Sequence, residues 1–201
     1  MVGRVELCSA GVVLEPLSLA HVDELVVAAT EDRTTYGFTW VPQDTATMRA
    51  YVETALADER RNWALPFVIR LRATDHVVGT SRFLDLDFWE GSLLPDTVEI
   101  GSTWLAASAQ GTHVNPEIKL LMLSHAFDVW DVHRVTFKTD ARNQQSRRAI
   151  ARLGATFEGV LRAHKLASDG TIRDSAYYSI VRAEWPTVKE QLVQRVAMSH
   201  T

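Results

Sequence analysis

The segment from Thr97 to Thr139 limits the possible folds more than any other part of this sequence. Alternating apolar residues predict one strand over Thr97–Leu105 and another over Arg134–Thr139. Apolar residues at helical spacing between them predict a helix from Pro116 to about Trp130. Its expected buried stripe contains Ile118, Leu121, Met122, Ala126 and Val129. Because a helical crossover joins strands that run in the same direction, the chain should contain a parallel strand pair.

The other patterns place antiparallel strands and further helices around this pair. Strands are expected at 12–17, 65–71, 77–84, 157–165 and 172–182, and helices at 18–30, 44–56, 143–153 and after 186. This order is that of an α/β (α+β) protein with a mixed, mostly antiparallel sheet, a central parallel pair and flanking helices. No repeat or linker interrupts it, so residues 1–201 are expected to form a single domain.

Composition and charge exclude several classes of protein. The chain is 46% hydrophobic and 23% charged, which is an ordinary globular balance. Cys8 is the one cysteine, so no internal disulfide can form, and no Cys/His spacing predicts a metal site. No apolar run approaches the roughly 18 residues that a membrane span needs, and no signal sequence is recognised. The net charge of −4 argues against nucleic acid. A cytoplasmic location without membrane or nucleic-acid partners is expected.

Several motifs follow one another in a specific order. A strand reads Val98-Glu99-Ile100-Gly101-Ser102-Thr103-Trp104-Leu105, and Gln110-Gly111-Thr112 then leads into the predicted helix. Further on come residues 139–146 (TDARNQQS), 149–155 (AIARLGA), 158–162 (EGVLR) and 169–174 (DGTIRD). From about Val12 to Trp185 this pattern resembles the GNAT superfamily, in particular its branch similar to ribosomal-protein N-terminal acetyltransferases.

The resemblance implies transfer of an acyl group from a coenzyme A thioester to a primary amine. Acetyl-CoA is the default donor and no metal is needed. The acceptor is a protein N-terminus or a small molecule, and a homodimer is left open. The residues expected to bind the cofactor are Leu105, Gln110, Gly111, Thr112, His113, Val114, Asn115, Asn143, Ser146 and Arg148.

The loop before the predicted helix would hold the diphosphate, because a helix N-terminus offers unpaired N–H groups and a positive dipole end. Here His113 and Asn115 occupy the two positions where the family has small residues, and the His113 side chain could crowd the phosphates. Asn115 and Pro116 fit the N-cap and first helical positions. A helix that is simply well capped is therefore the alternative interpretation.

The expected chemistry needs a neutral amine and an expelled thiolate. Deprotonation at pH 7 costs about 1 kcal/mol for an α-amine and about 4–5 kcal/mol for a lysine amine. Glu99 is the candidate base, acting through water; the alternative is a solvated or edge glutamate. Ser146 would hydrogen-bond the developing thiolate, and Asn143 would bind the pantetheine amides. Both also fit a helix cap, and the two roles are compatible.

Aromatic and basic residues suggest further contacts. Trp40, Glu99 and Tyr178 are candidates for acceptor binding, although Trp40 and Tyr178 also fit a core. The cluster of Arg147, Arg148 and Arg152 would meet the 3′-phosphate of the coenzyme, or else form a solvated face.

A second function class remains open: a catalytically silent GNAT-like module that binds a partner or senses a ligand. The residues His113 and Asn115 favour it, whereas Glu99, Asn143 and Ser146 oppose it. A nucleotide-dependent enzyme is disfavoured, because the chain has neither GxxxxGK[ST] nor GxGxxG after a strand.

Overall fold

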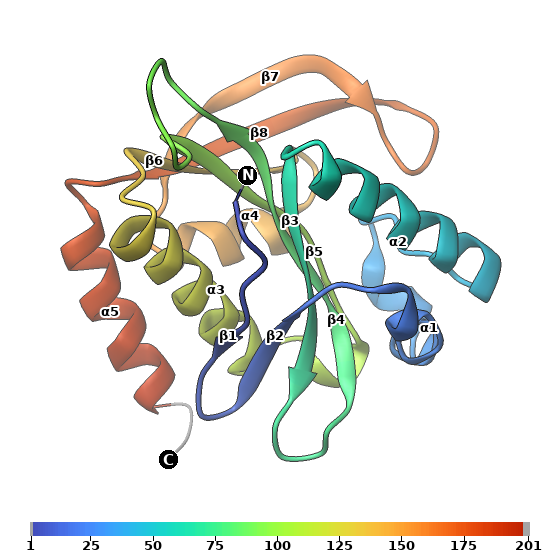
Figure 1. Cartoon of the computed structure of the whole chain (residues 1–201). Coiled ribbons are helices and arrows are strands. Elements are labelled where there is room, and N and C mark those ends of the chain that lie inside the picture. The colour runs from blue at the N-terminus through green and yellow to red at the C-terminus, as the bar shows by residue number, and fades with distance from the viewer. Residues whose placement is uncertain (1, 199–201) are drawn as a thin grey trace.

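The computed structural model describes residues 2–198 and contains one eight-stranded sheet in the order β1-β2-β3-β4-β5-β6-β8-β7 (Figure 1). The strands are β1 (Leu7–Cys8), β2 (Val12–Pro16), β3 (Ala64–Leu71), β4 (Val77–Asp87), β5 (Thr97–Leu105), β6 (Arg134–Asp140), β7 (Thr156–Leu166) and β8 (Ile172–Val181). All neighbouring strands are antiparallel except β5 and β6, which are parallel. The expected mixed sheet with a central parallel pair is confirmed; the short strand β1 was not anticipated.

Five α-helices cover the two sides of this sheet. They are α1 (Val22–Thr30), α2 (Thr45–Arg60), α3 (Val114–Ser124), α4 (Gln144–Ala151) and α5 (Trp185–Met198). Helices α1 and α2 contact β4 and β3, whereas α3 contacts β1, β2 and α5, and α4 contacts β6 and β8. Figure 1 shows α1 and α2 on one side of the sheet and α3 and α5 on the other. No helix within residues 2–198 is long and apolar enough to cross a membrane.

The parallel pair is short, and this shapes the middle of the molecule. Only residues 97–99 of β5 pair with residues 134–136 of β6, after which the strands no longer pair. Beyond this point β5 carries a bulge at Ser102, whose φ is +47°, and its register with β4 shifts. The two strands therefore leave an opening between their C-terminal halves, into which main-chain groups of both strands face without a strand partner.

The prediction of a buried stripe on the crossover helix is wrong at its last residue, Val129. Residues His125–Val129 form a π-helical turn, and the Val129 side chain is 60% exposed. A π turn contains an extra residue, so it rotates the residues that follow relative to an α-helical pattern. Phe127 and Trp130 are buried in place of Val129.

Gly79 in β4 gives the most direct test of how closely the central strands pack. Its φ is +149°, and a Cβ atom there would overlap with the Trp104 carbonyl oxygen. We expect Gly79→Ala to lower the free energy of unfolding by about 2–4 kcal/mol, because both the backbone and its neighbour must shift. Urea denaturation would measure this. Gly3→Ala, with nothing within 4 Å of its Cβ, is the control. Equal stability of the two variants would contradict the described strand packing.

Candidate active site

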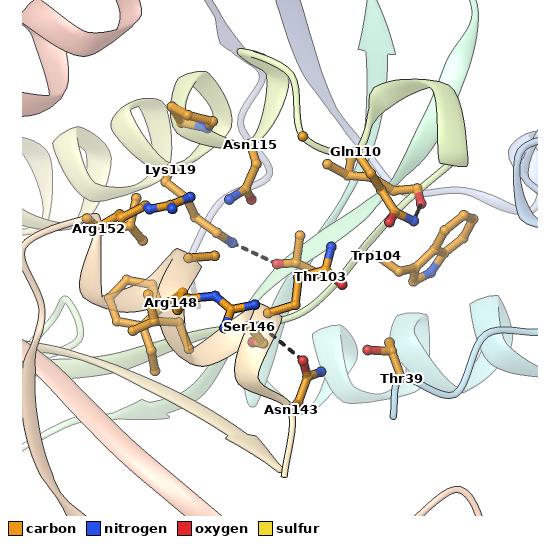
Figure 2. Close-up of a pocket in the computed structure, with 18 of the residues that line it drawn as sticks. Thr39, Thr103, Trp104, Gln110, Asn115, Lys119, Asn143, Ser146, Arg148 and Arg152 are labelled. Carbon is orange, nitrogen blue, oxygen red and sulfur yellow. Dashed lines mark hydrogen bonds between the residues drawn. The ribbon is translucent and has the colours of Figure 1, made fainter. Parts of the chain in front are cut away.

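A cavity of about 490 Å³ lies where β5 and β6 diverge. Its β5 lining begins at Ile100 and its β6 lining at Phe137, each just after the last paired residue of the strand. The turn at 110–112, the first residues of α3 and the inner side of α4 complete the walls (Figure 2). Thr35, Tyr36 and Thr39, from the segment after α1, close one end.

Most residues that the sequence predicts for cofactor binding line this cavity. They are Leu105, Gln110, Gly111, Thr112, Asn115, Asn143, Ser146 and Arg148. Val114 does not, because its side chain is buried in the core. His113 is also absent from the lining, and its Nε2 lies 4.0 Å from the Glu117 carboxylate. The side chain that was expected to crowd the phosphates is therefore directed elsewhere.

The start of α3 differs from the sequence-based expectation. The helix begins at Val114, so Asn115 is not its N-cap and Pro116 is not its first residue. The hydroxyl of Thr112 accepts a hydrogen bond from the Val114 N–H at 3.2 Å. Pro116 is tolerated because the first amides of a helix have no intrahelical acceptor. The Asn115 side chain is thereby left to face the cavity.

The cavity is lined by positive charge although the chain as a whole is acidic. The basic lining residues are Lys119, Lys138, Arg148, Arg152 and Arg195. Among the described residues that line it, none is Asp or Glu. Converging cations in a partly closed cleft attract and hold anions such as phosphates. Within residues 2–198, no group of three or more His, Cys, Asp or Glu side chains is placed to hold a metal ion.

Lys119 is a cavity residue that the sequence analysis missed. Its side chain is buried, and its Nζ donates hydrogen bonds to Thr103 Oγ1 at 2.7 Å and Ser81 Oγ at 3.3 Å. Burial lowers the pKa of this amine to about 7. The sequence did contain a signal that Lys119 is buried. It shares the spacing of a buried helix stripe with Met122, Leu123 and Ala126, and all four residues are buried.

Two tethers hold the walls of the cavity in place. The Gln110 side-chain amide donates to the Leu105 carbonyl at 2.9 Å and to the Thr35 hydroxyl at 3.0 Å, so it joins the turn before α3 to the segment after α1. Tyr36 packs edge-on against Trp104, with ring centroids 6.2 Å apart.

The start of α4 combines a cap with a cavity wall. Asn143 Oδ1 accepts a hydrogen bond from the Ser146 N–H at 2.9 Å, which is an N-cap contact. Both residues also line the cavity, so neither interpretation of them excludes the other. The three arginines of the predicted basic cluster lie in two places. Arg148 and Arg152 line the cavity, whereas Arg147 donates a hydrogen bond to the Tyr178 hydroxyl at 3.1 Å and its guanidinium lies over the Phe157 ring.

Glu99 lies directly behind the cavity wall. Its carboxyl group is buried, and Oε2 lies 2.5 Å from Lys138 Nζ, which also contacts Asp85 at 3.0 Å. Gly101 lines the cavity, and a Cβ atom there would lie 2.5 Å from Glu99 Oε1. The missing side chain of Gly101 thus leaves room for the carboxyl group. Burial raises the pKa of Glu99 to about 7, opposed by the Lys138 ammonium.

The two aromatic residues expected near the acceptor lie outside the cavity lining. The Trp40 side chain is 56% exposed and its ring centroid is 6.2 Å from that of Tyr51. Tyr178 is buried; it is paired with Phe137 in the sheet, and its hydroxyl accepts a hydrogen bond from Arg147 of α4. Its neighbour Tyr177 is paired with Lys138 and therefore shares the face of that lysine.

Comparisons with known proteins agree with this architecture. The Acetyltransferase (GNAT) domain family model matches residues 12–156. A GCN5-related N-acetyltransferase from Brucella melitensis has a TM-score of 0.84 and 28% identity, covering 97% of this chain and 86% of that one. A T. thermophilus protein assigned as an acetyltransferase has a TM-score of 0.81 and 32% identity, covering 97% and 98%.

Mycobacterium smegmatis RimJ, solved with CoA-disulfide, shares the fold with a TM-score of 0.77 and 23% identity, covering 96% of this chain and 93% of that one. No curated protein sequence matches the chain. The family match spans well over half of the sequence, and the T. thermophilus structure is aligned along nearly all of it. The chain belongs to the GNAT acetyltransferase family.

Proposed function

We propose that the chain transfers an acyl group, acetyl by default, from acyl-CoA to a primary amine. The observation that carries this proposal is the cavity between β5 and β6, whose lining contains basic side chains and, among residues 2–198, no acidic one. Coenzyme A carries its negative charge on a diphosphate and a 3′-phosphate. A cleft of this size and charge suits such a ligand, and the shared fold of M. smegmatis RimJ, solved with CoA-disulfide, supports the assignment.

Each part of the coenzyme has a matching part of the cavity in this proposal. The diphosphate lies at the 110–112 turn and the start of α3, next to the positive end of the helix dipole. The 3′-phosphate meets Arg148 and Arg152 of α4. The pantetheine arm runs between the diverging strands, where main-chain groups lack a strand partner, and Asn143 binds its amides.

The chemistry is direct attack of the amine on the thioester. The amine nitrogen bonds to the carbonyl carbon, the carbon–sulfur bond breaks, and the amine proton leaves through water to Glu99. A carboxyl group with a pKa of about 7 is well matched to a base that works near neutral pH. Ser146 donates a hydrogen bond to the departing thiolate, which takes a proton from solvent water, and Glu99 afterwards releases the amine's proton to solvent. The acceptor is a protein N-terminus or a small amine, approaching on the face of Lys138 and Tyr177.

The second candidate is a GNAT-like module without catalysis. Its support in the sequence was the pair His113 and Asn115, which replace small residues. In the structure His113 is directed toward Glu117, and Asn115 faces the cavity as a polar lining residue. The positions of His113 and Asn115 therefore leave the loop before α3 open to a cofactor and favour the acyltransferase over the non-catalytic module.

Calorimetric titration with acetyl-CoA, with succinyl-CoA and free coenzyme A alongside, tests the cofactor assignment. We expect dissociation constants on the order of micromolar for acetyl-CoA, because the cavity supplies several charge-assisted contacts to phosphates. Absence of binding to all three ligands would favour the non-catalytic module.

Replacing the proposed base tests the mechanism. Glu99→Gln should lower kcat/KM by on the order of 10- to 1000-fold and leave acetyl-CoA affinity nearly unchanged. The wild-type rate should rise with pH through about 7, since only the deprotonated carboxylate accepts the proton. In the variant, the rise of the rate near pH 7 should be absent, whereas any rise caused by deprotonation of the acceptor amine should remain. A full rate in the variant would remove Glu99 from the mechanism.

Two substitutions at Asn143 separate its cap from its proposed contact with the coenzyme. Asn143→Ala should lower the free energy of unfolding by about 1 kcal/mol, whereas Asn143→Ser keeps a capping oxygen and should change it by only a few tenths. Both should weaken coenzyme binding, because both lack the side-chain amide. Thermal denaturation and calorimetry measure the two effects. If Asn143→Ser binds coenzyme A as the wild type does, Asn143 acts as a cap alone.

A further inference from the structure

Lys119 presents a buried amine to the cavity, and no acidic partner for it lies within the described part of the chain. It is 6% exposed, and Figure 2 shows its amine directed toward Thr103 on the cavity wall. Its described hydrogen-bond partners are the hydroxyls of Thr103 and Ser81, which also contact each other at 2.7 Å. Burying a cation beside neutral groups costs free energy, so such an arrangement is normally compensated by an anion.

The charged groups around Lys119 do not supply that anion. Across the cavity lie Arg148 and Arg152 of α4, Lys138 of β6 and Arg195 of α5, which are all cations. On its own helix, the Glu117 carboxylate accepts a hydrogen bond from the Gly11 N–H at 2.9 Å, on the side facing β2. No ion pair of Lys119 is found within residues 2–198, and the lowering of its pKa has burial as its cause.

We propose that Lys119 binds the diphosphate of the coenzyme through its side chain and adds to the few N–H donors left at the start of α3. This inference rests on the proposed acyl-CoA function. Pro116 has no N–H and the Val114 N–H donates to the Thr112 hydroxyl, so fewer than the usual four main-chain donors remain for the diphosphate in the first turn of the helix. Lys119 supplies a charged donor in the same region of the cavity.

The geometry of a helix places this amine where an anion would bind. Side chains in a helix lean toward its N-terminus, so the Lys119 amine reaches back toward the first turn. Asn115 lies four residues earlier and therefore on the same helix face, and both residues line the cavity. The pair forms a side-chain recess for an anion next to the helix N-terminus.

Charge on Lys119 then depends on the ligand. With a pKa of about 7, the amine is only partly protonated at neutral pH in the empty site. A bound diphosphate favours the protonated form and raises the pKa, so binding takes up a proton. Affinity should fall as the pH rises from about 7 to 9, because protonating the amine becomes harder.

Titrations of Lys119→Met with four ligands test the contact. The ligands are coenzyme A, dephospho-coenzyme A, 4′-phosphopantetheine and pantetheine. We expect the variant to bind coenzyme A and its dephospho form on the order of 30-fold more weakly, with little change for pantetheine, which carries no phosphate. The control is Lys189→Met, which removes a lysine of α5 that pairs with Asp128 outside the cavity. Its coenzyme affinity should equal that of the wild type.

Calorimetry in two buffers with different heats of ionisation tests the proton uptake. At pH 7.5 the wild type should take up a fraction of a proton per coenzyme bound, and Lys119→Met should take up less. Lys119→Arg keeps a charge at every accessible pH, so it should retain binding with a weaker dependence on pH. Thermal denaturation of each variant checks that it is folded.

The possible results are distinct. If the wild type binds none of the ligands, both this inference and the acyl-CoA function are overturned. If the wild type binds coenzyme A and Lys119→Met binds it equally well, the Lys119 assignment alone is overturned. An equal loss for coenzyme A and pantetheine would also overturn it, because Lys119 would then act on the pantetheine arm or on the shape of the cavity.

Discussion

The early end of pairing between β5 and β6 is the constraint on which the rest of the structure depends. Three residues of each strand pair in parallel, and the strands then diverge. Continued pairing would fill the space that now forms the cavity and would use the main-chain groups that face it. The bulge at Ser102 also contributes to this opening, because it changes the direction of β5. Just after the bulge, the Thr103 hydroxyl accepts a hydrogen bond from Lys119.

Two helix N-termini and several basic side chains give this opening a positive electrostatic potential. The helices α3 and α4 both begin at the cavity, so two positive dipole ends are directed toward it, although most N–H groups in the first turn of α4 are already paired. Cationic side chains from α3, α4, α5 and β6 add to the same field. A chain with a net charge of −4 thus concentrates positive potential at one place, which is an arrangement for an anionic ligand rather than for solubility.

Glu99 is an acidic group beside this cationic cavity, and it is paired with one of the lining cations. Glu99 lies behind Gly101 and is paired with Lys138, so its carboxyl group is buried without facing the phosphate region. In the proposed function, this arrangement places a group able to accept a proton beside the cleft that holds the anionic coenzyme. The pKa of about 7 follows from burial, which outweighs the attraction of Lys138.

The sequence by itself determined the order of the main elements, the parallel pair and a group of the residues that line the cavity. Periodicity and the crossover length are local properties, whereas Gln110, Asn143 and Ser146 were identified from the resemblance to the GNAT superfamily. Only the tertiary structure decided where α3 begins, that His113 is directed toward Glu117, and that Val129 is exposed by a π turn. It also decided that Tyr177, rather than Tyr178, shares a face with Lys138, and that Lys119 and Arg195 reach the same cavity. These outcomes depend on strand register and on contacts between residues far apart in the chain, and local patterns carry no information about either.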